Sequence, residues 1–229
     1  MPTPLPPRIR GPKAVKVNPR VLLEAALTVF ARDGLQASSL RAIAREAGCD
    51  PALIYYHFRN KEDMFRALVE DRMPPVVEAL YRLASPEDRR SCAEKCWAIQ
   101  GVFHTHLQAS AGFRALVRGE MVRGAAGIKE ILAGKMVVAA RSIRAIFEEG
   151  VRQGQVRPGL DPFLMAFFLV RMEFEILDLA PSMSLPMGGI APETAVPMAE
   201  RTWFEVFWRG VAAHPEEPLP SLPPFPETP

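Results

Sequence analysis

Apolar side chains recur along this chain mostly at helical spacing. From residue 18 to residue 34, pairs of apolar positions repeat every four residues, which predicts a helix with one apolar face. Asn18 can cap its N-terminus, Pro19 suits its first turn, and Gly34 can end it. The pairs are Val21/Leu22, Ala25/Ala26 and Val29/Phe30.

Two short helices follow at once. Ser39 can cap the first, whose apolar face ends at Gly48, and Gly is the residue that helices favour just past their C-terminus. Asp50 can cap the second, which has Pro51 at its first position and runs to about Phe58. Two short helices joined by a glycine-containing turn form a helix-turn-helix, whose second helix can enter the major groove of DNA.

The rest of the chain also has the pattern of helices. Asn60 can cap a fourth helix, which the pair Pro74-Pro75 must kink or interrupt because proline removes a helical hydrogen bond. No stretch shows the sustained alternation of a β-strand. We therefore predict an all-α fold of about nine helices. The remaining five are expected at residues 85–108, 112–121, 128–153, 162–180 and 193–212.

These patterns divide the chain into four parts. Residues 1–17 are Pro-rich and basic, and we expect a flexible arm that either reaches the minor groove or, as we favour, only solubilises the protein. Residues 18–66 form the DNA-binding domain with its three-helix helix-turn-helix. We expect residues 67–213 to form a second, larger helical domain. Residues 214–229 are a Pro-rich tail without enough apolar side chains to fold.

Composition and charge support this division. The 229 residues contain 28 Lys/Arg and 26 Asp/Glu, but residues 1–72 carry 12 Lys/Arg against 8 Asp/Glu, so positive charge gathers at the end that holds the helix-turn-helix. The chain has no apolar run long enough to span a membrane and does not start like a secretory signal, so we expect a cytoplasmic protein. Its three cysteines suggest free thiols.

The helix-turn-helix resembles a known family. The run LRAIAREAGCDPALIYYHFRNKE from Leu40 to Glu62, preceded by VFARDG from Val29 to Gly34, is similar to the DNA-binding domain of the TetR (tetracycline repressor) family. The resemblance covers about residues 18–66. It implies a fold of about nine helices, a homodimer formed through the last two, and an inducer pocket in the C-terminal domain.

The resemblance also implies which residues meet the operator. Tyrosine hydroxyls and imidazole N–H groups can donate to phosphate, and a lysine at a helix N-terminus favours phosphate binding. The chain departs from the family pattern at Pro51 and Leu53, which shifts the expected base recognition toward apolar contact and DNA shape. Taken without their neighbours, the aromatic residues could equally pack as a surface corner. The predicted DNA contacts are Ser39, Arg41, Pro51, Ala52, Tyr55, Tyr56, His57 and Lys61.

Two sets of apolar residues in the C-terminal domain are candidates for function. Five large side chains suggest a pocket for a hydrophobic or aromatic ligand, namely Trp97, Phe103, Phe113, Met121 and Phe167. Stripes on the last two helices suggest a dimer interface, with Phe174, Leu177, Phe204, Phe207, Trp208 and Val211. We expect polar interface or pocket groups at Arg171, Glu175 and Asp178, and surface charges at Arg118 and Glu120.

Metal binding and catalysis find little support in the sequence. Cys92 and Cys96 share a helix face with His106, but His106 lies about 15 Å further along the axis, too far to share an ion. We interpret both cysteines as buried thiols and expect no metal or cofactor. No residue set resembles a catalytic site, so we predict a protein that is not an enzyme; an enzyme with an accessory helix-turn-helix is the remote alternative.

The sequence thus predicts a ligand-responsive transcriptional regulator, a repressor in the form we favour. It would bind a palindromic operator in double-stranded DNA as a homodimer and leave it when a small molecule binds. The alternative is a DNA-binding regulator of the same fold whose C-terminal domain serves only for dimerisation or for binding a protein partner.

Overall fold

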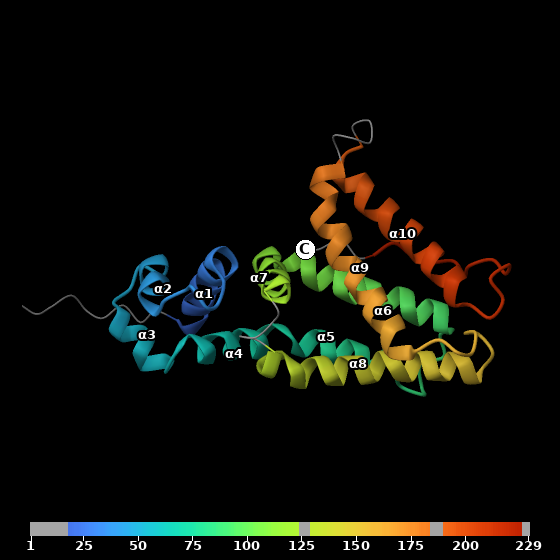
Figure 1. The fold of residues 1–229 in the computed structure, drawn as a ribbon, viewed down its shortest axis with the longest axis horizontal. Helices are drawn as coiled ribbons and strands as arrows, with labels where there is room; N and C mark the ends of the chain where they lie inside the picture. Colours follow the sequence, from blue (N-terminus) through green and yellow to red (C-terminus); the bar gives the residue numbers. More distant parts are fainter. Residues whose placement is uncertain (1–17, 124–128, 184–189, 226–229) are drawn as a thin grey trace, which may run out of the picture.

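The computed structural model describes residues 18–123, 129–183 and 190–225 (Figure 1). Within these ranges the chain forms ten helices and no strand, apart from an isolated β-bridge between Val156 and Ala212. None of these helices is long and apolar enough to cross a membrane. Their bounds are α1 Pro19–Asp33, α2 Leu40–Glu46, α3 Pro51–His57, α4 Lys61–Arg72, α5 Pro74–Leu83, α6 Cys92–Ala109, α7 Ala111–Val122, α8 Lys129–Arg152, α9 Pro162–Met183 and α10 Pro192–Val211.

The all-α prediction is confirmed, with ten helices where about nine were expected. The additional helix arises at the predicted proline interruption. The backbone N–H of Met73 still donates to the Val69 carbonyl, at 2.9 Å, but Pro74 has no N–H and begins a new helix at its first position. In Figure 1, α4 and α5 follow one another along the lower side of the molecule.

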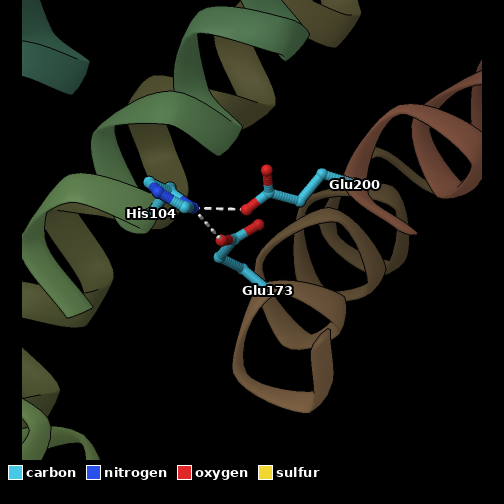
Figure 2. Close-up of side chains that lie close together, drawn as sticks. All are labelled: His104, Glu173 and Glu200. Carbon is cyan, nitrogen blue, oxygen red and sulfur yellow. Dashed lines mark hydrogen bonds and ion pairs between the residues drawn. The ribbon is translucent and has the colours of Figure 1, made fainter. Parts of the chain in front are cut away.

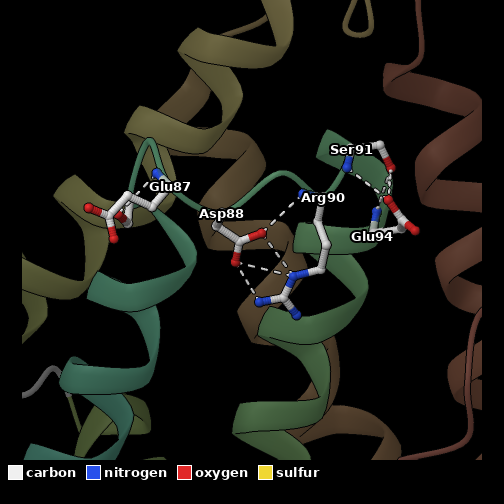
Figure 3. A network of polar contacts seen from close by, with 6 residues as sticks. Glu87, Asp88, Arg90, Ser91 and Glu94 are labelled. Carbon is white, nitrogen blue, oxygen red and sulfur yellow. Dashed lines mark hydrogen bonds and ion pairs between the residues drawn. The ribbon is translucent and has the colours of Figure 1, made fainter.

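The predicted start of α6 was wrong. We expected a helix from Ser85, but α6 begins only after Ser91, whose hydroxyl accepts from the Glu94 N–H at 3.3 Å while the Glu94 carboxylate accepts from the Ser91 N–H at 2.8 Å. Asp88 pairs with the Arg90 guanidinium instead of capping a helix (Figure 3). Two serine-plus-acid patterns lie close together here, and the reciprocal capping box decides between them.

The four N-terminal helices share a core that continues through α7 to α9. Fully buried apolar side chains from α1, α2, α3 and α4 meet there, and the rings of Phe30 and Phe65 lie edge to face with centroids 6.5 Å apart. α1 also packs against α7, which lies between the N-terminal helices and the rest of the protein (Figure 1).

The C-terminal helices pack around a second core. α6 packs against α5, α8 and α9, and α9 packs against α10. Leu80, Ile99, Phe147, Leu169 and Phe204 come from five different helices and are almost completely buried in this core. The fold thus places the helix-turn-helix at one end, and α9 and α10 lie on the other side of α7 from it (Figure 1).

The Pro-rich tail is more ordered than predicted. Residues 219–225, called the C-terminal strap below, pack along α6: Leu222 is buried, the Phe225 ring stacks on Trp97 with centroids 4.3 Å apart, and the Trp97 indole N–H donates to the Pro223 carbonyl at 2.8 Å. Prolines lower the conformational entropy that this segment loses when it becomes ordered, so the contacts of two apolar side chains, Leu222 and Phe225, are enough to hold it. The basic arm predicted at residues 1–17 and residues 226–229 lie outside the described residues.

Candidate DNA-binding surface and ligand cavity

Local caps and one glycine set the geometry of the helix-turn-helix. The Ser39 hydroxyl accepts from the Ala42 N–H at the start of α2, and the Asp50 carboxylate accepts from the Ala52 N–H at the start of α3. Between the helices Gly48 has a φ of 63°, in the left-handed region that glycine adopts at no steric cost. The predicted caps and turn are confirmed, and they fix the angle at which α3 leaves α2.

The burial of Ile54 decides which face of α3 is free. Its side chain is completely buried in the core that α3 shares with α1, α2 and α4, so residues on the opposite face point outward. Tyr55 is 60% exposed and Tyr56 81%, a large exposure for aromatic side chains. Seven of the eight predicted DNA contacts are exposed, and they come from the N-terminus of α2 and the outer face of α3; they are Ser39, Arg41, Pro51, Ala52, Tyr55, Tyr56 and His57.

Lys61, the eighth predicted contact, is half-buried. Its ammonium donates to the carbonyl of Gln36 at 2.6 Å and lies 3.4 Å from the carbonyl of Ser38. These bonds tie the first residue of α4 to the segment just before α2. Lys61 therefore has a structural contact that the sequence did not reveal, beside its predicted role at phosphate.

A narrow apolar cavity lies among α5, α6, α7, α8 and α9. Its volume is about 180 Å³, and four of the five residues predicted to line a ligand pocket lie around it, namely Phe103, Phe113, Met121 and Phe167. Two polar side chains lie on its wall. Arg171 pairs with Glu175 at 2.6 Å, whereas the His106 Nε2 atom is buried without a hydrogen-bond partner among the described residues.

Burial and the nearby charge of Arg72 lower the pKa of His106, so its ring is neutral at neutral pH. A neutral imidazole can accept or donate one hydrogen bond at the free nitrogen. The cavity therefore combines an apolar wall with one polar group able to orient a ligand.

Trp97, the fifth predicted pocket residue, lines a different cavity. This second cavity has a volume of about 690 Å³ and lies between α6 and the C-terminal strap. Val76 and His106 line both cavities, so their side chains form the partition between them. Sequence reasoning could not separate Trp97 from the other four residues, because the strap that forms one wall of this second cavity was expected to be unfolded.

α7 connects the small cavity to the DNA-binding helices. Phe113, Val117 and Met121 of α7 face the cavity, while the same helix packs on α1. Glu120 was expected at the surface, but it is 2% exposed and accepts the Leu35 N–H at 3.1 Å. That expectation was wrong because Glu120 satisfies a backbone donor at the end of α1 that burial would otherwise leave unpaired.

A second link runs through the end of α4. The Arg72 guanidinium pairs with the Glu24 carboxylate on α1 and lies 3.5 Å from the Ser110 hydroxyl, at the junction of α6 and α7. The exposed Arg118 and the half-buried Arg114 both pair with Asp178 of α9, at 2.7 and 3.1 Å. The first ion pair joins α4 to α1, and the other two join α7 to α9.

The residues predicted for a dimer interface lie mostly inside a single chain. Trp208 is half-buried, and the other five are at most 8% exposed: Phe174, Leu177, Phe204, Phe207 and Val211. A side chain buried within its own subunit has little surface left for another. The apolar stripes of α9 and α10 therefore build the subunit core, and the outer faces of these helices present other apolar residues, among them Leu164, Phe168, Leu179, Met198 and Val206.

The structure also brings together three polar residues that sequence reasoning missed. His104 of α6, Glu173 of α9 and Glu200 of α10 are 8%, 0% and 2% exposed (Figure 2). Burial opposes the charge of His104, but hydrogen bonds and charges from the two glutamates outweigh it and raise the pKa of His104 to about 9. Burial raises the pKa of Glu173 to about 7. One signal for this cluster was present in the sequence: Glu173 and Glu200 each lie among the apolar residues of their helix.

The cysteine pair takes no part in this cluster. Cys49, Cys92 and Cys96 are free thiols, and Cys92 and Cys96 are buried, as the sequence predicted. Burial raises the pKa of the Cys96 thiol well above its ordinary value, which keeps it protonated and unreactive.

Comparison with known proteins gives a consistent family. Residues 22–68 match the family model described as "Bacterial regulatory proteins, tetR family". The chain is 42% identical over 153 residues to the HTH-type transcriptional repressor KstR2 of Mycolicibacterium smegmatis, covering 65% of this chain and 72% of that protein.

Solved structures share the fold. The ketosteroid transcriptional regulator KstR2 of Mycobacterium tuberculosis superposes with a TM-score of 0.66 at 20% identity, over 86% of this chain and 96% of that one. The regulator FadR of Bacillus subtilis, solved in complex with stearoyl-CoA, superposes with a TM-score of 0.62 at 20% identity, over 83% of this chain and 98% of that one.

Proposed function

Because the chain belongs to the tetR family of bacterial regulatory proteins, we propose that it is a transcriptional repressor released from DNA by a small apolar molecule. It binds a palindromic operator as a homodimer through residues 18–66, and residues 67–213 sense the ligand and dimerise. It works in the cytoplasm, where its operator is. The observation that carries this proposal is the double role of α7, which lines the apolar cavity with one face and packs on α1 with another.

The exposed face of α3 supports operator binding. Pro51 and Ala52 leave room for close approach to base edges, while the hydroxyls of Tyr55 and Tyr56 and the His57 ring can donate to phosphates. A dimer places two such helices in successive major grooves about 34 Å apart, so the operator has two-fold symmetry.

The outer faces of α9 and α10 support dimerisation. Phe168 of α9 is 45% exposed and Val206 of α10 is 62% exposed. Apolar side chains gathered on neighbouring helices lower their free energy by packing against a second copy. The proposed interface therefore still uses α9 and α10, but it consists of their outward-facing residues instead of the buried ones predicted from the sequence.

The cavity supports an apolar ligand of the fatty-acyl or steroid class. Relatives with this fold include a ketosteroid regulator and a regulator that holds stearoyl-CoA. A cavity of about 180 Å³ is smaller than the roughly 300–1,000 Å³ of most ligand sites, so such a ligand must widen it. Displacement of His106 would join the two cavities, because its ring lies in the wall that they share.

Widening the cavity accounts for release of DNA. Movement of α7 disturbs the bond from the Leu35 N–H to Glu120 and the packing of α1, and so shifts the two recognition helices relative to each other. A shift of a few ångströms misaligns helices that must enter two grooves at once.

A titration in both directions tests the proposal. An operator duplex is first selected from a random palindromic library, and its affinity is then measured by fluorescence anisotropy with stearoyl-CoA or a ketosteroid present. Weaker operator binding must be matched by equally weaker ligand binding to the operator complex. Ligand that binds free and DNA-bound protein equally well would sink the inducer model and leave the C-terminal domain as a dimerisation or partner-binding module.

Filling the cavity gives a sharper version of this test. Ala140→Phe adds a ring from α8 where the ligand would sit. The variant should bind operator within about twofold of the unaltered protein and lose its response to ligand. Gly210→Ala, which adds a methyl group in open space on α10, is the matched control and should keep the response.

A further inference from the structure

Three buried side chains from three helices converge on one point (Figure 2). The His104 Nδ1 atom lies 3.2 Å from a carboxylate oxygen of Glu173 and within hydrogen-bond distance of one of Glu200. One ligand atom from each residue lies within 4.8 Å of the others. We propose that His104, Glu173 and Glu200 form a binding site for a divalent first-row transition metal ion, with Zn²⁺ or Mn²⁺ as the best match.

An unpaired carboxylate oxygen supports a cation-binding site. Glu173 is completely buried, and its second carboxylate oxygen, Oε2, has no hydrogen-bond partner among the described residues. Buried polar atoms are nearly always paired because desolvation without compensation is costly. Two buried carboxylates facing one imidazole have more acceptor atoms than the ring can satisfy. A cation bound between them would satisfy the remaining oxygens.

The donor atoms select the class of ion. One imidazole nitrogen with two carboxylate oxygens suits Zn²⁺, Mn²⁺ or Fe²⁺, whereas Mg²⁺ and Ca²⁺ prefer oxygen ligands alone. Three protein ligands also leave a coordination position for water or for a group of a bound molecule. The site is therefore of the open kind.

Gln108 completes the arrangement from the other side of the ring. Its side-chain amide lies 3.1 Å from His104 Nε2, four residues along the same helix. Turned so that its oxygen accepts the Nε2–H, the amide leaves the Nδ1 lone pair facing the two glutamates. Histidines that bind metals are usually held by such a second hydrogen bond.

The position of the cluster gives an ion a consequence. A metal ion would join α6, α9 and α10, which contribute one ligand each. Phe103 precedes His104 and Phe174 follows Glu173 in the sequence, and both rings line the small cavity. Metal binding would therefore fix two walls of the cavity relative to each other, whether or not the protein binds DNA as proposed.

The test measures metal binding on the full chain after removal of metal with a chelator. Isothermal titration with Zn²⁺ or Mn²⁺ should give one ion per chain and raise the thermal midpoint, and Mg²⁺ should do neither. His104→Ala and Glu173→Gln should abolish both effects. His214→Ala and Glu175→Gln, which change an exposed histidine and a half-buried glutamate elsewhere, should retain them.

Two further measurements cover variants that fail to fold. Gln108→Ala changes a partly exposed contact and should weaken affinity about 10- to 100-fold while leaving one site. Co²⁺ bound to the unaltered protein should show visible bands without a thiolate charge-transfer band, since no cysteine belongs to the site.

Three results would overturn the proposal. The first is no metal binding by the unaltered chain, which would make the cluster a proton-linked ion pair. The second is full metal affinity in Gln108→Ala, His104→Ala or Glu173→Gln. The third is a thiolate charge-transfer band, which would assign the ion to a cysteine instead. Each readout is independent of operator binding.

Discussion

At the residue scale, the contact of Lys61 with two backbone carbonyls gives this side chain two possible tasks. In the isolated chain its ammonium holds the segment before α2, and on DNA the same charge can turn to a phosphate. The two tasks have different salt dependence, because only a phosphate contact releases counterions from DNA.

We expect Lys61→Ala to weaken binding to every duplex and to lower the slope of log affinity against log salt by about 0.9, the amount for one phosphate contact. The slope is measured by anisotropy over a salt series. Lys135→Ala, which removes a lysine paired with Glu70 on α4, should leave the slope unchanged. An unchanged slope for Lys61→Ala, with a lower thermal midpoint, would assign Lys61 the structural task alone.

Glu120 offers a second prediction at this scale. Removing its carboxylate leaves the Leu35 N–H buried and unpaired, which costs about 1–3 kcal/mol. Glu120→Ala should therefore lower the free energy of unfolding by about that amount in urea denaturation, and Glu120→Gln, which keeps an acceptor, should lose less. Glu78→Ala changes a glutamate that is 69% exposed and serves as the control. Equal losses in the two alanine variants would contradict this role for Glu120.

Residue type and spacing predicted some of these residues and missed others. Phe103, Phe113, Met121 and Phe167 were chosen only as large adaptable side chains, and they share a cavity because such residues gather where helices leave space. In the cluster, His104 meets two glutamates that lie 69 and 96 positions further along the chain. Its formation depends on how three helices are rotated against one another, which no local pattern encodes.

At the scale of elements, α1 and α7 approach closely at one point. A Cβ atom added to Gly112 of α7 would lie 3.3 Å from Leu27 of α1, tighter than ordinary packing. This glycine lets the two helices come together, and in the proposed function α7 carries the effect of the ligand cavity to the DNA-binding helices.

Gly112→Ala should therefore push α7 away from α1 and reduce the effect of ligand on operator affinity. Helix propensity alone would make the change stabilising by up to about 1 kcal/mol, as expected for Gly210→Ala, where a methyl group meets open space. We expect Gly210→Ala to gain stability and to keep the full effect of ligand on operator affinity. Gly112→Ala should gain less stability and show a smaller effect of ligand on operator affinity. Coupling is measured by titrating operator with and without ligand. The same coupling in both variants would remove this contact from the route.

Helix boundaries were predictable where a single local signal acts. Asn18 with Pro19, and Asp50 with Pro51, begin α1 and α3 as expected, because caps and prolines act within one turn. The start of α6 was missed because two capping patterns compete within a few residues, and the outcome depends on Asp88 pairing with Arg90.

At the scale of the whole molecule, we expect the outer faces of α9 and α10 to form the dimer interface. Phe168→Glu and Val206→Glu each place a charge on an exposed apolar position of these helices. If these faces meet in the dimer, each charge would be buried unpaired, so both variants should sediment as monomers and bind operator poorly. Val122→Glu introduces the same charge at a residue that is 77% exposed at the end of α7 and should remain dimeric. Dimers in all three variants would place the interface elsewhere.

The fold class followed from the sequence, whereas the residues of the dimer interface stay a prediction. The sequence assigned the apolar stripes on α9 and α10 to the interface. In the structure, α9 packs on α6 and α8 of the same chain, and the buried residues of both stripes belong to its cores. Periodicity shows that a face is buried without showing which partner buries it.

The C-terminal strap also sets an order of events during synthesis. The hydrogen bond from Trp97 to Pro223 spans 126 residues, and the strap follows every described helix in the chain. A ribosome that adds about 5–20 residues per second needs roughly 6–25 s to make that stretch, and Trp97 lacks its partner throughout. The larger cavity is consequently closed only at the end of synthesis, when the strap forms its wall. A protease that cleaves the strap would open this cavity again.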